Sequence, residues 1–131
     1  MWVAASDARW MCLPPAIDSP ARSREFLRQS LTAWGLSDLV DDALLLVSEL
    51  ASNALLHARS SMVVTASWSP GAGVLRVTVR DDQQEGEPTV RHADSQATSG
   101  RGLEIVATVS SRWGILRDHD GKAVWFELAR R

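Results

Sequence analysis

The sequence has a single cysteine, no tyrosine and no long apolar run. The one cysteine, Cys12, cannot form a disulfide within the chain, and no Cys or His stands beside it at zinc-ligand spacing. The longest purely apolar run in the helical part covers residues 43–47, far short of the ~20 residues that span a bilayer. Residues 1–9 include Asp7 and lack the basic and apolar regions of a signal peptide. We therefore expect a cytoplasmic protein without a membrane segment.

The chain also lacks an excess of basic residues. Lys and Arg number 14 against 16 Asp and Glu, which gives a formal net charge of −2 and a pI near 5.9. This balance excludes the basic footprint of a typical nucleic-acid-binding protein, so we expect no direct nucleic-acid partner. With 131 residues, 45% of them hydrophobic, we expect one domain over residues 1–131, in which residues 1–9 are a flexible N-terminus.

The hydrophobic pattern predicts three helices and five strands. Apolar residues at spacings of three and four predict a helix from Ser37 to about Ala58, and Pro20 and Gly35 mark the ends of an earlier helix. Alternating apolar residues predict strands on both sides of a turn at 69–73. The expected order is a strand at 10–13, helices at 20–34 and 37–58, strands at 61–68 and 74–80, a helix at 102–110, and strands at 113–117 and 122–128. This order indicates an α+β fold, a two-layer α/β sandwich with a mostly antiparallel sheet and the helices on one face.

Glu49 and Asn53 stand four residues apart on the second predicted helix, about 40° apart around its axis. Both lie at one edge of the apolar arc, where they can face a cleft. A carboxylate beside a carboxamide suits an acceptor for a hydroxyl proton next to a Mg²⁺ ligand, because hard cations prefer oxygen donors. The pair also fits a solvated helix flank, and His57, one turn further on, also fits a hydrogen bond at the helix end.

Two further features flank residues 81–99, a long aperiodic stretch of the kind that is usually a lid or binding loop. Asp81 ends a strand, and its carboxylate suits the exocyclic amine of adenine rather than the carbonyl of guanine; an ordinary turn aspartate is the alternative. At residues 98–103 (TSGRGL) glycine lets backbone N–H groups approach phosphate oxygens, and Arg101 adds a cation. A flexible loop also explains this segment.

Taken together and in this order, the motifs resemble the GHKL ATPase superfamily, which includes gyrase and the histidine kinases. The chain looks most like the anti-sigma-factor serine/threonine kinases, especially the small ATP-binding regulators of actinobacteria. The sequence LLLVSELASNALLHARS at 44–60 resembles the N box, LRVTVRDD from Leu75 the first glycine box, TSGRGLEIV from Thr98 the second, and GKAVWFEL from Gly121 the closing strand. The resemblance covers roughly residues 10–128.

The resemblance implies a Bergerat-type ATP site between the helices and the sheet. It assigns the general base to Glu49, the Mg²⁺ ligand to Asn53 and the adenine contact to Asp81. It further implies that residues 82–99 form the ATP lid, and that the nucleotide phosphates lie against Ser99, Gly100, Arg101, Gly102 and Leu103.

Two positions depart from the family pattern. The D-x-G-x-G box reads Asp81-Asp82-Gln83-Gln84-Glu85, which keeps the aspartate and loses both glycines. In the closing box Ala123 stands where the family has a threonine hydroxyl near the nucleotide. We therefore expect low nucleotide affinity and a lid that is placed differently.

The resemblance implies an ATP- and Mg²⁺-dependent serine/threonine protein kinase that is also an anti-sigma factor. Its expected substrate is an anti-anti-sigma antagonist, and its expected partners are that antagonist and a sigma factor. The lost glycines favour an alternative, a non-catalytic nucleotide-binding module that sequesters a protein partner. The first helix is either a solvated basic face or a contact for partners and a homodimer, and the residues concerned are Arg22, Arg24, Phe26, Leu27, Arg28 and Leu31.

Overall fold

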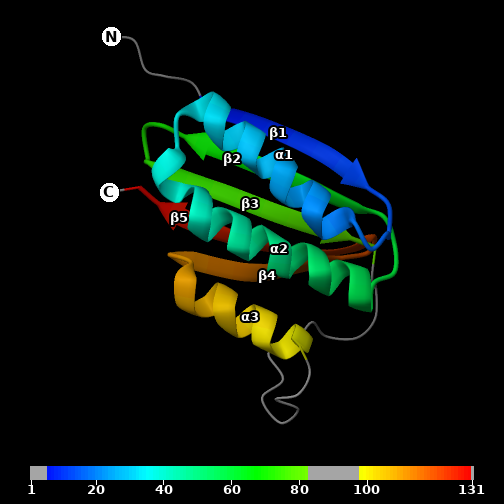
Figure 1. The fold of residues 1–131 in the computed structure, drawn as a ribbon. Helices are drawn as coiled ribbons and strands as arrows, with labels where there is room; N and C mark the ends of the chain where they lie inside the picture. Colours follow the sequence, from blue (N-terminus) through cyan, green and yellow to red (C-terminus); the bar gives the residue numbers. More distant parts are fainter. Residues whose placement is uncertain (1–5, 83–97, 131) are drawn as a thin grey trace.

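The computed structural model describes residues 6–82 and 98–130, which form two layers (Figure 1). One layer is a five-stranded sheet, and three α-helices cover one of its faces. The strands are β1 (Asp7–Leu13), β2 (Met62–Ser69), β3 (Val74–Asp81), β4 (Arg112–Asp118) and β5 (Gly121–Ala129). The helices are α1 (Ser19–Trp34), α2 (Val40–His57) and α3 (Thr98–Val109), and a short 3₁₀ helix, η1 (Ser37–Leu39), precedes α2. The two-layer α+β architecture expected from the sequence is thus confirmed.

The sheet has the strand order β1-β2-β3-β5-β4, and all four strand pairs are antiparallel. Its two faces differ as the alternation in the sequence predicts. In β2 and β3 every second side chain is buried under the helices, while the residues between them are partly exposed on the other face. The buried residues of these two strands are Met62, Val64, Ala66, Trp68, Leu75, Val77, Val79 and Asp81.

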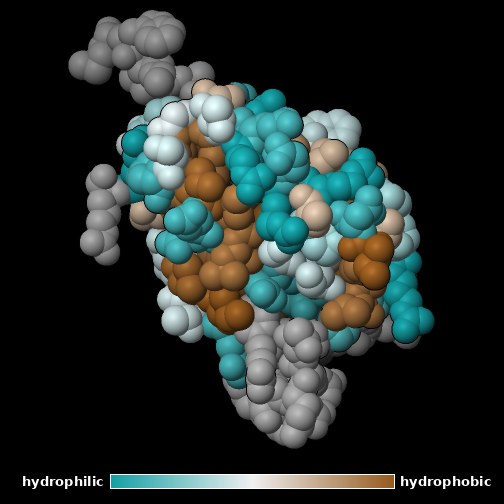
Figure 2. All heavy atoms as spheres, in the orientation of Figure 1, coloured by the Kyte–Doolittle hydropathy of each residue, from teal (hydrophilic) through white to brown (hydrophobic). Residues whose placement is uncertain are grey.

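Helix α2 lies at the centre of the helical layer, with α1 on one side, α3 on the other and the sheet beneath it. Because it has three neighbours, it buries a wider arc than an edge helix would. Its buried residues are Ala43, Leu44, Leu46, Val47, Leu50, Ala51, Asn53 and Ala54. The exposed large apolar side chains of α2 are Leu45 and Leu56, and Figure 2 shows that apolar side chains on this helical face gather in a band among polar ones.

Three predicted boundaries are wrong by a few residues. Strand β1 begins at Asp7 rather than Trp10, because residues 7–9 pair with β2, so they are not part of a flexible N-terminus. The second helix, α2, begins at Val40 rather than at Ser37, which instead begins η1. Helix α3 begins at Thr98, four residues before the predicted start at Gly102, so its first turn includes two glycines although glycine is a poor helix former.

The end of α1 follows the predicted chemistry. Gly35 has the left-handed conformation (φ 70°), its N–H donates to the carbonyl of Thr32, and the N–H of Leu36 donates to the carbonyl of Leu31. This pattern satisfies two of the last carbonyls of the helix. No helix in the described part of the chain is long and apolar enough to cross a membrane.

Candidate functional site

Asp81 and the start of α3 lie at the end of the helical layer at which α2 ends. Just beyond the end of α2, the Ser60 hydroxyl accepts a hydrogen bond from the backbone N–H of Asp82 at 3.2 Å, which brings this end beside the end of β3. Asp81 in turn pairs with Lys122 at the start of β5. The other end of α3 lies away from this point, because the N–H of Ser111 donates to the carbonyl of Glu127 near the end of β5. The start of α3 therefore points toward the same end of the molecule as Asp81.

Glu49 is half-buried on α2, and its carboxylate has no hydrogen bond or ion pair with any other residue in the described ranges. Burial raises the pKa of Glu49 above its ordinary value of 4.5, since desolvation disfavours the charged form. A carboxylate that has no partner and a raised pKa is well suited to accept a proton from a substrate.

Asn53 lies one turn after Glu49 and is only 7% exposed. The sequence predicted it at the edge of the apolar arc; the structure buries it because α2 packs between α1 and α3. Its amide Nδ2 is buried and has no hydrogen-bond partner among the described residues. A buried polar atom without a partner costs about 1–3 kcal/mol, so such an atom in a native protein calls for an explanation, and a bound water, an ion or a catalytic role is among the usual ones.

The donor set at Asn53 fits a magnesium ion that is held mainly by a nucleotide. A half-turn of the amide exchanges its nitrogen and its oxygen, so this buried group can present an oxygen ligand. The described residues hold no cluster of three His, Cys, Asp or Glu side chains that would form an all-protein metal cage. Mg²⁺ commonly takes one or two protein ligands together with substrate phosphates, and this chain offers such an arrangement.

Asp81 carries an ion pair that sequence analysis did not find. The Nζ of Lys122 donates a hydrogen bond to Oδ2 of Asp81 at 2.5 Å, and both side chains are only 2% exposed. Gly121 makes this pairing possible: its φ is 151°, and a β-carbon there would overlap the carbonyl oxygen of Asp81. The two charged side chains therefore meet in the buried layer between sheet and helices.

The position that faces the helices in the closing strand is Lys122, not Ala123. Ala123 pairs with Arg80, and both side chains project from the opposite face of the sheet to Asp81 and Lys122. The expectation that Ala123 stands near the nucleotide is therefore wrong by one residue. The signal that could have identified Lys122 is its rarity, because it is the only lysine in the chain.

The predicted phosphate-binding segment lies in the first turn of α3. Ser99, Gly100, Arg101 and Gly102 have helical backbone there, and their side chains lie outside the described residues. The first backbone N–H groups of a helix have no partner within it and carry partial positive charge, which suits a phosphate. Leu103 is 1% exposed in the core, so only its backbone remains for such a role. The predicted lid, apart from Asp82, Thr98 and Ser99, lies outside the described residues.

The predicted contact surface on α1 is only partly exposed. Leu27 and Leu31 are fully buried in the core, so they cannot contact a partner. Arg24 donates to the Ser48 hydroxyl of α2 at 2.5 Å, and Arg28 pairs with Glu25 on the surface at 2.8 Å. The basic residues of α1 therefore mostly serve the protein's own packing and surface.

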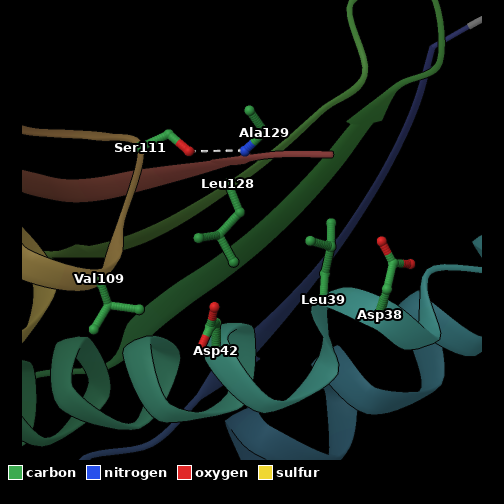
Figure 3. Close-up of a pocket in the computed structure, with 7 residues that line it drawn as sticks. All are labelled: Asp38, Leu39, Asp42, Val109, Ser111, Leu128 and Ala129. Carbon is green, nitrogen blue, oxygen red and sulfur yellow. Dashed lines mark hydrogen bonds between the residues drawn. The ribbon is translucent and has the colours of Figure 1, made fainter. Parts of the chain in front are cut away.

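A hollow of about 570 Å³ lies at the opposite end of the helical layer, between the start of α2 and the ends of α3 and β5 (Figure 3). Asp42 and Leu128 point into it from α2 and β5. It shares no residue with the predicted site, whose members lie in the second half of α2, at the end of β3 and at the start of α3. Its full lining is Asp38, Leu39, Asp42, Val109, Ser111, Leu128 and Ala129.

Comparison with solved structures supports the fold. A crystal structure of the RsbU and RsbW domains of Rv1364c from Mycobacterium tuberculosis matches with a TM-score of 0.72 and 22% identity. The match covers 94% of this chain and 32% of that chain, so this chain spans about a third of its length. The histidine kinase domain of the blue-light activated histidine kinase from Erythrobacter litoralis EL346 is 31% identical, with a TM-score of 0.48, over 68% of this chain and 43% of that one.

Comparison with curated proteins gave no match. The profile of the histidine kinase-like ATPase domain, by contrast, matches residues 13–128, which run from the last residue of β1 almost to the end of β5. Within the described ranges, the match includes all three α-helices and the strand ends at which Asp81 and Lys122 meet. The chain therefore belongs to the histidine kinase-like ATPase domain family.

Proposed function

We propose that this chain binds ATP with Mg²⁺ and acts as a regulatory serine/threonine protein kinase of the anti-sigma-factor type. Membership of the family implies nucleotide binding. The observation that carries the proposal of phosphoryl transfer is that Glu49 and Asn53 lie one turn apart on α2. One is a half-buried carboxylate without a partner among the described residues, and the other is a buried amide whose nitrogen has none.

In the proposed reaction Glu49 orients the hydroxyl of a substrate Ser or Thr and accepts its proton. The hydroxyl oxygen forms a bond to the γ-phosphorus, the bond between that phosphorus and the bridging oxygen breaks, and ADP leaves with the bonding pair. Asn53 supplies a ligand to Mg²⁺, and Asp81 accepts a hydrogen bond from the adenine amine. When bound, Mg²⁺ neutralises charge on the phosphates. The backbone of the first turn of α3 supplies N–H donors to the same phosphates.

The proposed substrate is an anti-anti-sigma antagonist, and a sigma factor is the proposed second partner. This assignment is supported by the sequence resemblance and by the fold shared with a structure that contains an RsbW domain. Phosphorylation adds nearly two negative charges to the antagonist, which would separate the two proteins and free this chain for the sigma factor.

The alternative is a nucleotide-binding module that sequesters a partner without transferring phosphate. The loss of both glycines of the D-x-G-x-G box at residues 81–85 favours this alternative, and the presence of Glu49 and Asn53 favours the kinase.

Calorimetry with Mg·ATP tests the binding step. The proposed function requires binding at millimolar or lower concentration and weaker binding of GTP. Incubation with ATP and an anti-anti-sigma protein, followed by mass spectrometry, tests the transfer step. Absence of heat with ATP would end the proposal, and tight ATP binding without transfer to any antagonist would favour the sequestering module.

A further inference from the structure

The only lysine of the chain is buried in the candidate nucleotide site. Lysine is almost never fully buried unless it is paired, because an ammonium group is costly to remove from water. Here the pairing is with Asp81, and every other basic residue of the chain that is not a histidine is an arginine. A compact ammonium group therefore stands directly beside the carboxylate that is proposed to bind adenine.

The strand geometry fixes this juxtaposition. Asp81 and Lys122 are register partners on β3 and β5, with their side chains on the helix-covered face. Gly121 lets the start of β5 approach the backbone of Asp81 more closely than any residue with a β-carbon allows. A hydrogen-bond acceptor and a hydrogen-bond donor thus lie side by side at 2.5 Å.

This pair matches the edge of an adenine ring. Adenine carries an amine donor on C6 and, next to it, the acceptor N1. A base whose amine donates a hydrogen bond to Asp81 therefore places its N1 next to the carboxylate. A hydrogen-bond donor beside the carboxylate can then contact N1. Guanine placed in the same orientation has a carbonyl oxygen at C6 and an N–H at position 1, so it would face a carboxylate with an acceptor and an ammonium with a donor.

We propose that Lys122 is a base-specificity residue, whose ammonium group donates a hydrogen bond to N1 of the adenine held by Asp81. The inference rests on the proposed nucleotide-binding function and adds a second, independent contact to it. If Asp81 alone contacted the base, guanine would lose one hydrogen bond, the one made by the amine of adenine. With Lys122 beside Asp81, guanine has two mismatched groups, its C6 carbonyl at Asp81 and its N1–H at Lys122. Lys122 therefore strengthens the preference for adenine as well as the affinity for it.

The sharpest test removes the acceptor from the ligand rather than the lysine from the protein. In 1-deaza-ADP a C–H replaces N1, while the exocyclic amine that contacts Asp81 remains. Calorimetry with Mg·ADP and Mg·1-deaza-ADP on the wild-type protein should show that the deaza compound binds about tenfold to a hundredfold more weakly, the effect of one hydrogen bond from a charged group. This comparison needs no variant, so it stands even where a variant fails to fold.

The protein side of the test is Lys122→Met, which keeps the length of the side chain and removes the donor. Binding of Mg·ADP should fall to the level of Mg·1-deaza-ADP, and the variant should bind the two compounds equally. Arg28→Met on α1 is the matched control; this side chain is on the surface and pairs with Glu25, so both affinities should stay at wild-type values. Circular dichroism of each variant checks that it is folded.

A second measurement observes the ammonium group itself. Selective ¹⁵N-lysine labelling gives one side-chain signal in this chain, because it has one lysine. That signal should shift on addition of Mg·ADP and shift much less with Mg·1-deaza-ADP.

Three results would overturn the inference. Equal affinity of the wild type for both compounds would leave the proposed function intact and remove Lys122 from base contact. Tighter binding of ADP by Lys122→Met than by the wild type would show that the lysine competes with the nucleotide for Asp81. Failure of both proteins to bind ADP would overturn the proposed function, and the inference with it.

Discussion

Gly121 passes so close to the backbone of Asp81 that a β-carbon at this position would overlap the Asp81 carbonyl oxygen. The φ of Gly121 is 151°, a conformation that residues with side chains rarely adopt. Gly121 therefore determines how closely β5 approaches the end of β3. It thereby positions the buried ion pair between Lys122 and Asp81. Its replacement should disturb both the sheet and the proposed base pocket.

Gly121→Ala should lower the free energy of unfolding by about 1–3 kcal/mol, the usual cost of forcing extra atoms into a packed site. Urea unfolding followed by circular dichroism measures the change. Gly71→Ala is the matched control, because no atom lies within 4 Å of a β-carbon at Gly71; that change should be neutral or slightly stabilising. Equal stabilities for the two variants would mean that the approach at Gly121 relaxes at no cost.

The buried pair itself should show strong thermodynamic coupling. Lys122→Met leaves the Asp81 carboxylate without its buried cation, and loss of one partner from such a pair typically costs about 3–5 kcal/mol. Asp81→Asn combined with Lys122→Met removes both charges and should cost less than the sum of the two single changes. Urea unfolding of the wild type, both single variants and the double variant gives the coupling energy. Additive losses would show that the two groups do not depend on one another.

Much of this architecture follows from local pattern. The alternation in β2 and β3 identifies the buried face correctly, and Gly35 ends α1 as its chemistry predicts. These features depend on the spacing of apolar residues and on a glycine that can adopt left-handed backbone, and both signals are visible in a single sequence.

The details of the site depend on contacts between segments that are distant in sequence, and those could not be predicted. The period of α2 defines one buried face, but it does not reveal that α3 packs on a further side and buries Asn53. The phase of β5 depends on its register with β3, and an error of one residue exchanges the two faces of a strand. The family resemblance drew attention to Ala123, while the structure turns Lys122 toward Asp81.

The raised pKa of Glu49 predicts a pH-dependent difference between the wild type and Glu49→Gln. Below pH 4.5 Glu49 is protonated in both folded and unfolded chains, so the two proteins should be equally stable. As the pH rises from 4.5 through the higher pKa of the folded state, the unfolded chain ionises more readily and the wild type loses stability. Glutamine stays neutral, so the variant should be slightly more stable than the wild type at neutral pH. The effect is small because the group is only half-buried.

Thermal unfolding of both proteins between pH 4 and pH 8 measures this difference. Glu25→Gln, at an exposed glutamate of α1, is the control and should show no comparable gain. A wild type that is more stable than Glu49→Gln at neutral pH would reveal an attractive partner for the Glu49 carboxylate, and such a partner would weaken its assignment as the base.

The final prediction separates binding from transfer on α2. Asn53→Ala should weaken Mg·ATP binding, because it removes the proposed metal ligand from a buried position. Glu49→Ala should leave Mg·ATP affinity nearly unchanged, since a general base acts mainly in the transition state, while transfer to an antagonist falls by about 10²–10⁴. Calorimetry for ATP and mass spectrometry of the antagonist give the two readouts. Asp42→Ala, at the opposite end of the same helix, is the control and should change neither readout. Equal transfer by the wild type and Glu49→Ala would exclude Glu49 as the base, and unchanged Mg·ATP affinity in Asn53→Ala would exclude Asn53 as the ligand.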